Sequence, residues 1–483
     1  MGRPGRSNWK DVATVKYVST RGEAPELGFA DVLLTGLAAD GGLYVPKSWP
    51  VLSRETIAGF AGKPYAEVAE AVIAPFVGDD IDRATLSRMI REAYAEFRHP
   101  AVTPLVQLAP NRFVMELFHG PTLAFKDVAM QLLGRLMDHV LAERGQRATI
   151  VGATSGDTGG AAIEAFRGRA RTDIFILFPD GRVSDVQRRQ MTTPTEDNVH
   201  TLALSGTFDD CQTIVKGMFT HAAFRDQVQL AGVNSINWAR IVAQVVYYFV
   251  AGAALGAPHR PVSFTVPTGN FGDIFAGFVA AQMGLPIERL VIATNSNDIL
   301  TRTLESGAYE TRGVMPTIAP SMDIQISSNF ERLLFEVHGR DGGEIRRLMA
   351  RLGQSGGFTL AGPGLEAIRE TFDAGRASEA EISATIARTL EESGYLLDPH
   401  TAIGVHVAER QSAGEAPMVV LATAHPAKFP DAVEAACGVR PALPPSLAPM
   451  MQAPERFERL DATRESVEAH ILSTARAVGL EVG

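Results

Sequence analysis

The sequence predicts an α/β protein in which strands of a parallel sheet alternate with helices. Beyond Thr103, short apolar runs are separated by longer stretches of helical periodicity, which is how βαβ units appear in a sequence. The predicted strands are ATIVGA (148–153), DIFILFP (173–179), VSFTVPT (262–268), RLVIATN (289–295) and MVVLATA (418–424). Several of them end in Gly-, Ser- or Thr-rich loops, and open α/β sheets bind ligands beyond the carboxyl ends of their strands. We therefore expect the functional site in these loops.

The chain divides into three predicted regions. Residues 1–100 hold amphipathic segments that end in a turn-rich stretch, so we expect a separate cap-like domain there. Residues 101–440 carry the alternating strands and helices. Residues 441–483 begin with a proline-rich connection and are predicted to end in one polar helix.

Composition excludes several classes of protein. The chain of 483 residues is 46% hydrophobic, with a formal net charge of -10, so nothing favours binding to nucleic acid or to an anionic membrane. The apolar window 245–257 is too short to span a bilayer and predicts a buried helix. Cys211 and Cys437 lie far apart, which argues against a disulfide framework or a metal site. A reducing cytosol is the simplest compartment, and the start of the chain lacks a signal peptide's apolar stretch.

The loop Gly269–Asp273 follows a predicted strand and opens an apolar helix. Its two glycines let a ligand approach the backbone, and the free N–H groups of the helix start favour an anion. We expect Asp273 to cap this helix. A plain tight turn is an equally good interpretation of this loop taken alone.

Two further loops combine anion-binding groups. ATSGDTGG offers the hydroxyls of Thr154, Ser155 and Thr158 at a helix start, which suit a carboxylate, although a capping turn explains them as well. NSINWAR places Asn234 and Ser235 about one and a half helical turns before Arg240. An arginine beside amide and hydroxyl donors suits a phosphate or carboxylate, whereas a capped helix with a salt bridge is the commoner meaning of such a pattern.

Lys126, one of only seven lysines, is predicted at the N-terminal end of a long amphipathic helix. A cation is disfavoured there by the helix dipole, and the adjacent Phe125 favours a neutral amine with a lowered pKa. Such an amine can condense with an aldehyde. The alternative is a lysine that simply reaches solvent. A reactive lysine together with several anion sites at strand ends fits pyridoxal phosphate and an anionic amino-acid substrate.

The order of motifs resembles the threonine synthase family of fold-type II pyridoxal-phosphate enzymes. The resemblance rests on STRG, DGGLYVP, HGPTLAFKD, TSGDTG, NSINWARI, PTGNFGD, SMDIQISSNFERLLFE and TAHPAKF, and it spans residues from about 17 to about 440. It implies a fold like the β subunit of tryptophan synthase, with two open parallel-rich sheets and an N-terminal cap domain. It also implies a monomer or homodimer that converts O-phospho-L-homoserine and water into L-threonine and phosphate.

The resemblance also implies roles for individual residues. Lys126 matches the lysine that holds the cofactor and moves protons, and Thr423 matches the hydroxyl residue facing the pyridine nitrogen. The residues that match the loop around the cofactor phosphate are Gly269, Asn270, Phe271, Gly272 and Asp273. Those that match the substrate carboxylate site are Thr154, Ser155 and Thr158, and those that match the substrate phosphate site are Asn234, Ser235 and Arg240.

Asp157 stands where many fold-type II enzymes have Asn, near the phenolic oxygen of the cofactor. Two oxygens that both favour negative charge repel one another, so we expect the Asp157 carboxyl to be turned away, protonated or bound to a neighbour.

Four other functions are alternatives to threonine synthesis. A threonine dehydratase, or a phospho-lyase that eliminates without adding water, would share the fold type. A nicotinamide oxidoreductase is disfavoured because no G-x-G-x-x-G follows a strand, and a noncatalytic binding protein gives no reason for Lys126.

Overall fold

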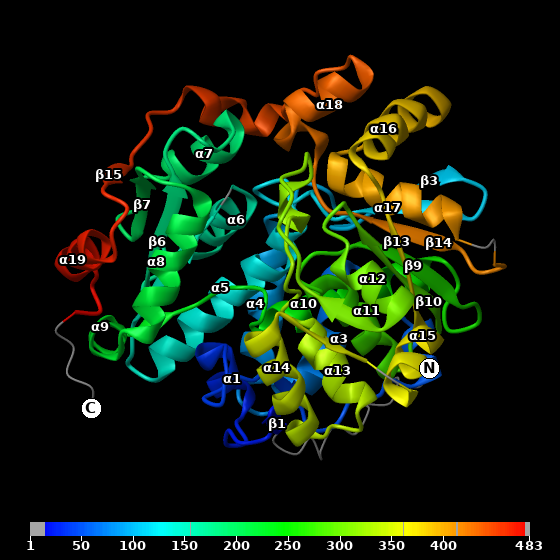
Figure 1. Ribbon diagram of the computed structural model, residues 1–483, viewed down its shortest axis with the longest axis horizontal. Helices are drawn as coiled ribbons and strands as arrows, with labels where there is room; N and C mark the ends of the chain where they lie inside the picture. The colour runs from blue at the N-terminus through cyan, green and yellow to red at the C-terminus, as the bar shows by residue number, and fades with distance from the viewer. Residues whose placement is uncertain (1–14, 155, 361, 412–413, 479–483) are drawn as a thin grey trace, which may run out of the picture.

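Two open sheets form the central part of the protein (Figure 1). The structure is a computed structural model that describes residues 15–154, 156–360, 362–411 and 414–478. The larger sheet has the strand order β13-β10-β9-β14-β4-β3, and the smaller has the order β15-β7-β6-β5-β8. All neighbouring pairs are parallel except β3 with β4. The predicted α/β class with parallel-rich sheets is confirmed.

The five predicted strands all form. The strands of the larger sheet are β3 (Leu105–Ala109), β4 (Arg112–Glu116), β9 (Val262–Pro267), β10 (Ile287–Thr294), β13 (Phe372–Arg376) and β14 (Met418–Ala422). Those of the smaller sheet are β5 (Ala148–Ala153), β6 (Thr172–Pro179), β7 (Val199–Leu204), β8 (Leu230–Ala231) and β15 (Glu458–Leu460). Every residue of β6 and β9 is buried, because helices cover both faces of a parallel sheet. That burial explains their continuous apolar sequences.

Helices cover both sheets and join their strands. They are α5 (Lys126–Glu143), α6 (Asp157–Phe166), α7 (Asp185–Thr192), α8 (Phe208–Thr220), α9 (Ala222–Val228), α10 (Trp238–Ala254), α11 (Gly272–Gln282), α12 (Ile299–Ser306), α13 (Phe330–Val337), α14 (Gly342–Ser355), α15 (Pro363–Thr371), α16 (Glu379–Ser393), α17 (Pro399–Arg410) and α18 (Pro430–Cys437). Shorter elements are the antiparallel pair β11 (Ala308–Glu310) and β12 (Gly357–Thr359), and the 3-10 turns η1 (Pro320–Met322) and η2 (Pro426–Lys428).

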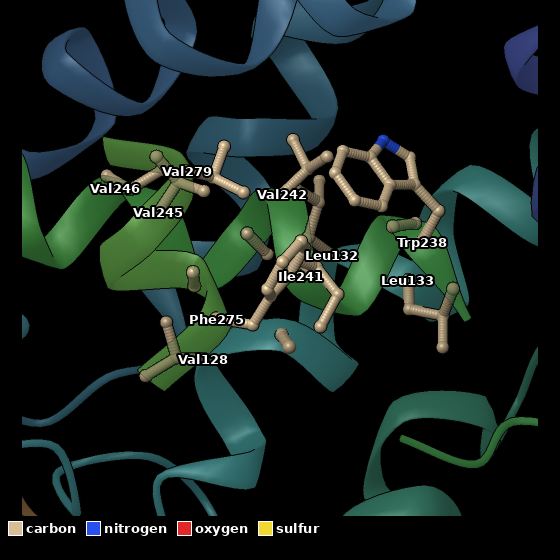
Figure 2. Packing of buried hydrophobic residues seen from close by; sticks show 14 of the residues in the cluster. Val128, Leu132, Leu133, Trp238, Ile241, Val242, Val245, Val246, Phe275 and Val279 are labelled. Atoms are coloured by element: carbon tan, nitrogen blue, oxygen red, sulfur yellow. The ribbon is translucent and has the colours of Figure 1, made fainter. Parts of the chain in front are cut away.

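The predicted buried helix is α10, which lies in the centre of the core. Figure 2 shows Ile241 and Val245 of α10 close to Leu132 of α5 and Phe275 of α11. Because α5 and α11 both pack against α10, almost all of the side chains of α10 are apolar and buried. Within the described ranges, no helix combines the length and the apolar character that crossing a membrane requires.

The N-terminal region packs on these central helices. Its elements are β1 (Tyr17–Ser19), α1 (Phe29–Thr35), β2 (Tyr44–Pro46), α2 (Arg54–Ala58), α3 (Tyr65–Val77) and α4 (Arg83–Ala95). The Trp238 ring of α10 lies 6.0 Å from the ring of Tyr17 and 5.8 Å from that of Phe76. One hydrophobic cluster therefore runs through this region and the helices beneath it. The boundary at residue 100 stays a prediction.

The C-terminal region contains the 3-10 helix η3 (Pro445–Gln452), the strand β15 and the predicted terminal helix, α19 (Arg464–Thr474). The strand β15 extends the smaller sheet by pairing with β7, and it was not predicted because its sequence, ERL, is polar. Two ion pairs fix this region to the smaller sheet and its helices: Arg188 with Glu455 at 2.8 Å, and Arg476 with Asp173 at 2.7 Å.

Candidate active site

A cavity of about 980 Å³ opens at the carboxyl ends of strands from both sheets. Its walls come from segments that follow β5, β7, β9 and β14, which is where an open α/β sheet places its ligands. The predicted site residues that line it are Lys126, Thr158, Asn234, Ser235, Arg240, Gly269, Asn270, Phe271, Gly272, Asp273 and Thr423. Residues as far apart in the sequence as Lys126 and Thr423 therefore line one cavity.

Lys126 is the first residue of α5 and points its amine into this cavity. The turn before it is fixed by Asp127, whose carboxylate accepts hydrogen bonds from the Thr122 N–H at 2.8 Å and the Thr122 hydroxyl at 2.7 Å. Lys126 is only 9% exposed, and its Nζ lies 4.9 Å from the centre of the Phe125 ring. Burial lowers the pKa of Lys126, and attraction by Asp157 offsets this only in part. The structure thus agrees with the predicted amine of lowered pKa.

The loop before α11 forms a cradle of backbone. Phe271 has φ 65°, in the left-handed region that non-glycine residues rarely adopt, and it turns the chain directly into the helix. A Cβ on Gly269 would lie 3.1 Å from the carbonyl oxygen of Ser321, so the loop is packed closely against its neighbour. The first N–H groups of α11 have no intrahelical acceptors, which suits an anion at this point.

A neighbouring segment braces this cradle. Asn329 donates from its backbone N–H and from Nδ2 to the carbonyl oxygen of Asn270, at 3.0 and 2.9 Å. Its Nδ2 also lies 3.2 Å from the carbonyl oxygen of Ser235, and the Ser327 hydroxyl donates to the carbonyl oxygen of Gly269 at 2.6 Å. Asn329 therefore ties the two predicted anion sites together.

The prediction that Asp273 caps α11 is wrong. Phe271 occupies the capping position without a side-chain hydrogen bond, and the Asp273 carboxyl turns toward α10, where it accepts from the hydroxyls of Tyr247 and Tyr248. Burial raises the pKa of Asp273 to about 7, although these hydroxyls act in the opposite direction. Near neutral pH, a carboxyl that is partly protonated would repel an anion in this cavity less than a full carboxylate would.

Asn234, Ser235 and Arg240 line another part of the cavity. The helix α10 is capped by Asn237, whose side chain accepts from the Ala239 N–H, so Asn234 and Ser235 are not used as its cap. Arg240 is 5% exposed, and burial lowers the pKa of its guanidinium to about 10. Its Nη1 donates to the carbonyl oxygen of Val233 at 3.2 Å, while the buried Nε has no partner among the residues that the structure describes. A buried guanidinium with a free donor is suited to an anion in the cavity.

The predicted carboxylate site is only partly described. Thr158 lines the cavity, and Ser155 lies outside the described residues. The Thr154 hydroxyl accepts from the N–H groups of Gly156 and Gly159, at 2.9 and 3.0 Å, and so stabilises the start of α6 behind the cavity wall. The role of these three residues in substrate binding stays a prediction.

Asp157 is bound to its neighbours, which is one of the three expected outcomes. Its Oδ1 lies 3.0 Å from the Nζ of Lys428 and accepts from Nε2 of Gln187 at 2.9 Å. Its Oδ2 accepts from the Ser321 hydroxyl at 3.2 Å. Burial acts to raise the pKa of Asp157, but the charges of Lys428 and Lys126 outweigh it and hold the pKa well below its usual range. Asp157 is therefore a carboxylate.

Several of these groups were missed by the sequence analysis. Lys428 and Asn329 lie within two motifs of the family resemblance, TAHPAKF and SSNFERLLFE. These motifs could have indicated that the two residues belong to the site, but not what each of them does. Gln187 has no such signal, because it reaches Asp157 from α7, 30 residues farther along the chain. His400 also lines the cavity, where its Nε2 accepts from the Ser321 N–H at 3.3 Å.

Three family models match successive parts of the chain. Residues 16–94 match the threonine synthase N terminus, residues 97–364 match the pyridoxal-phosphate dependent enzymes, and residues 401–471 match the threonine synthase C-terminal region. Together they cover most of the sequence, including the N-terminal region that packs on α5 and α10.

Individual relatives agree with these models over nearly the whole length. Threonine synthase of Pseudomonas aeruginosa is 53% identical over 459 residues, which cover 95% of this chain and 98% of that protein. The crystal structure of pyridoxal-phosphate-bound threonine synthase from Brucella melitensis is 66% identical and has a TM-score of 0.95, covering 96% of this chain and 100% of that one. The yeast threonine synthase structure is 39% identical with a TM-score of 0.91, covering 97% and 99%. This chain belongs to the threonine synthase family of pyridoxal-phosphate-dependent enzymes.

Proposed function

We propose that this enzyme converts O-phospho-L-homoserine and water into L-threonine and phosphate. Family membership makes it a pyridoxal-phosphate-dependent lyase of fold type II that acts in threonine biosynthesis. The observation that carries the choice of substrate is one cavity with a buried lysine and two separate anion sites, the loop before α11 and the Arg240 site. One site serves the cofactor phosphate, which leaves the other for a phosphorylated substrate.

The residues of the cavity fit pyridoxal phosphate. Lys126 supplies a buried amine with a lowered pKa for the aldehyde group. The closely packed backbone of 269–272 suits the phosphate. Thr423 lines the cavity just after β14, and we assign its hydroxyl to the pyridine nitrogen. A hydroxyl there leaves that nitrogen formally neutral, unlike a carboxylate.

When bound, pyridoxal phosphate supplies an electron sink for negative charge at the substrate Cα. In our proposal Lys126 removes the proton from Cα and later moves a proton at Cβ, because a neutral amine is a competent base. Phosphate leaves from Cγ, a proton is added there, the hydroxyl of water adds at Cβ, and a proton returned to Cα completes L-threonine. The phosphate of the substrate accepts hydrogen bonds from Arg240, Asn234 and Ser235. The carboxylate of the substrate accepts hydrogen bonds from Thr158 and from the adjacent helix start.

Arg240 has a second proposed role after phosphate has left. A guanidinium keeps its charge throughout, so the departing phosphate stays bound beside the reacting carbons. A phosphate oxygen held there can accept a proton from water and so activate it for addition at Cβ. The elimination and the hydration would then use one and the same binding site.

Product analysis tests the proposed reaction. The purified enzyme should release phosphate and threonine from O-phosphohomoserine in equal amounts. Release of phosphate with 2-oxobutyrate and no threonine would identify a lyase that eliminates without adding water and would refute the proposal. Absence of phosphate release would refute the assignment of the substrate itself.

Asn329→Ala is expected to weaken retention of pyridoxal phosphate. The substitution removes the Nδ2 hydrogen bonds to Asn270 and Ser235, leaving two carbonyl oxygens without that donor, at a cost of about 1 to 3 kcal/mol. Equilibrium dialysis should show a dissociation constant raised roughly tenfold. Ser328→Ala is the matched control, since the partly buried Ser328 makes one long hydrogen bond of 3.3 Å to the Asn270 side chain. Equal affinities in the two variants would contradict the bracing role of Asn329.

Asp273→Asn is expected to change how stability depends on pH. With a folded-state pKa of about 7, Asp273 keeps its proton where the unfolded chain has lost it. Its contribution to the free energy of unfolding therefore falls as the pH rises from about 4 to about 7, by at most about 1.4 kcal/mol per pH unit. Chemical denaturation of the cofactor-free protein should show this fall in the wild type and a flatter profile in the variant.

The control for this measurement is Asp431→Asn, since the Asp431 side chain is 88% exposed. Its profile should run parallel to that of the wild type. A profile for Asp273→Asn that is also parallel to the wild type would contradict the burial-driven pKa of Asp273.

We also infer a cytoplasmic location and a monomer or homodimer. The location is supported by Cys211 and Cys437, which are both free thiols, because thiols stay reduced in the cytosol. The oligomeric state follows from the family resemblance, and light scattering during size-exclusion chromatography would measure it.

A further inference from the structure

A second lysine is buried close to Lys126, on the far side of Asp157. Lys428, in η2, is 0% exposed. Its Nζ lies 2.7 Å from the carbonyl oxygen of Thr122, 2.9 Å from Oε1 of Gln190 and 3.0 Å from Oδ1 of Asp157. Three acceptors match the three N–H donors of an ammonium, whereas a neutral amine has only two. These are the contacts of a charged lysine.

Lys428 and Lys126 share a single carboxylate. The Oδ1 atom of Asp157 faces Lys428 at 3.0 Å, and the Oδ2 atom lies 3.7 Å from the Nζ of Lys126. Gln187 adds a donor on the side of Lys428, and Ser321 donates to Oδ2. The closer and better-fixed partner of Asp157 is therefore Lys428, and Lys126 lies beyond hydrogen-bond distance.

The charges of this buried group favour loss of a proton from Lys126. With both lysines protonated, two positive charges face one negative charge, and the group carries a net charge in a region of low dielectric. Loss of one proton makes the group neutral. The Nζ of Lys428 has three acceptors within 3.0 Å, whereas the Nζ of Lys126 lies 3.7 Å from its nearest carboxylate oxygen, so Lys126 is the better placed of the two to be neutral.

We propose that Lys428 is a positioning residue that keeps the Lys126 amine neutral in two ways, by its own positive charge and by holding the Asp157 carboxylate as its partner. The inference rests on the proposed role of Lys126 as the reactive amine. In the absence of Lys428, Asp157 would pair with Lys126 alone and favour its protonated form, which can neither bind an aldehyde nor accept a proton. The ion pair explains why a carboxylate is tolerated beside Lys126.

Other charged or titratable groups also face this pair. They are Asp127 on α5, Arg240 on α10, Asp273 on α11 and His400 on α17. Burial is the largest influence on the pKa of Lys126, Asp157 opposes it, and Lys428 and Arg240 reinforce it. These other groups are the same in every variant below, so differences between variants report on Lys428 and Asp157.

The test measures the protonation of Lys126 directly. The full-length protein, freed of cofactor, is treated briefly with acetic anhydride over a range of pH, and acetylation of Lys126 is quantified by mass spectrometry of peptides. Only the neutral amine reacts. Lys216, an exposed lysine of the same cavity, reports on access of the reagent and should be acetylated to the same extent in all proteins.

Lys428→Met should raise the midpoint of Lys126 labelling by about one pH unit or more, because a nearby charge typically shifts a pKa by that much. Asp157→Asn should lower the midpoint. Lys428→Arg, which keeps the charge, should stay close to the wild type. A midpoint that is unchanged or lowered in Lys428→Met would overturn the proposal.

Lys428→Met leaves a buried carboxylate without its main partner and can therefore fail to fold, which circular dichroism would show. In that event the comparison is between Asp157→Asn and the double variant Asp157→Asn with Lys428→Met, in which both charges are gone. The double variant should have the higher Lys126 midpoint, and equal midpoints would overturn the proposal. The labelling result does not depend on which product the enzyme forms. The proposed role of Lys428 can therefore be refuted while the proposed reaction is confirmed, and the proposed reaction can be refuted while the role of Lys428 is confirmed.

Discussion

Lys126→Ala is expected to abolish threonine formation while leaving the fold intact. Removing the amine deletes both the proposed attachment point of the cofactor and the proposed base, and a base of this kind contributes about 10²- to 10⁴-fold to the rate on its own. Turnover should therefore fall below detection in an assay of phosphate and threonine. The side chain ends in a cavity, so its loss removes little packing, and circular dichroism should be unchanged.

Lys126→Arg separates the chemistry of Lys126 from its charge. It keeps a positive charge near Asp157, but a guanidinium has no neutral amine to react at ordinary pH. We expect it to be as inactive as Lys126→Ala. Threonine formation by either variant would remove Lys126 from the mechanism.

Arg240→Gln is expected to weaken capture of the phosphorylated substrate with little effect on the cofactor. Hydrogen bonds to a charged group contribute about 1.5 to 3 kcal/mol, so kcat/KM for O-phosphohomoserine should fall roughly tenfold to hundredfold, chiefly through KM. Equilibrium dialysis of pyridoxal phosphate should give nearly the wild-type affinity, because the cofactor phosphate is assigned to the loop before α11. The combined result distinguishes the two anion sites.

The matched control is Lys216→Ala, since Lys216 is an exposed cation on the wall of the same cavity. It should change KM less than Arg240→Gln does. An unchanged KM in Arg240→Gln would contradict the substrate phosphate site, and a large loss of cofactor affinity would mean that the two anion sites are exchanged.

Elements with a strong local signal were predicted correctly. The strands β5, β6 and β9 have continuous apolar sequences because both faces of a parallel sheet are covered, and α10 is apolar because helices surround it. The strand β15 was missed because it lies at a sheet edge and has polar side chains. Its position depends on pairing with β7, which the local sequence does not encode.

The candidate site shows the same division between local and distant information. The sequence indicated the lysine and the loops that line the cavity, since each follows a strand and opens a helix or sits at its start. It did not predict that Asp273 turns toward Tyr247 instead of capping its helix, because the tyrosine lies 26 residues away. Nor did it predict which neighbour binds Asp157, since Lys428 arrives from the far end of the chain. Contacts of this range are decided by tertiary packing.

The most direct test of the central claim is to identify the lysine that carries the cofactor. Lys126 and Lys428 are both buried and both face Asp157. Lys428 is therefore the alternative lysine to which the cofactor could be attached. The yellow holoenzyme is reduced with borohydride, digested and analysed by mass spectrometry. We predict that the visible absorption band disappears and that the added pyridoxyl mass lies on the peptide of Lys126. Attachment to Lys428, or a protein that binds no pyridoxal phosphate, would contradict the account.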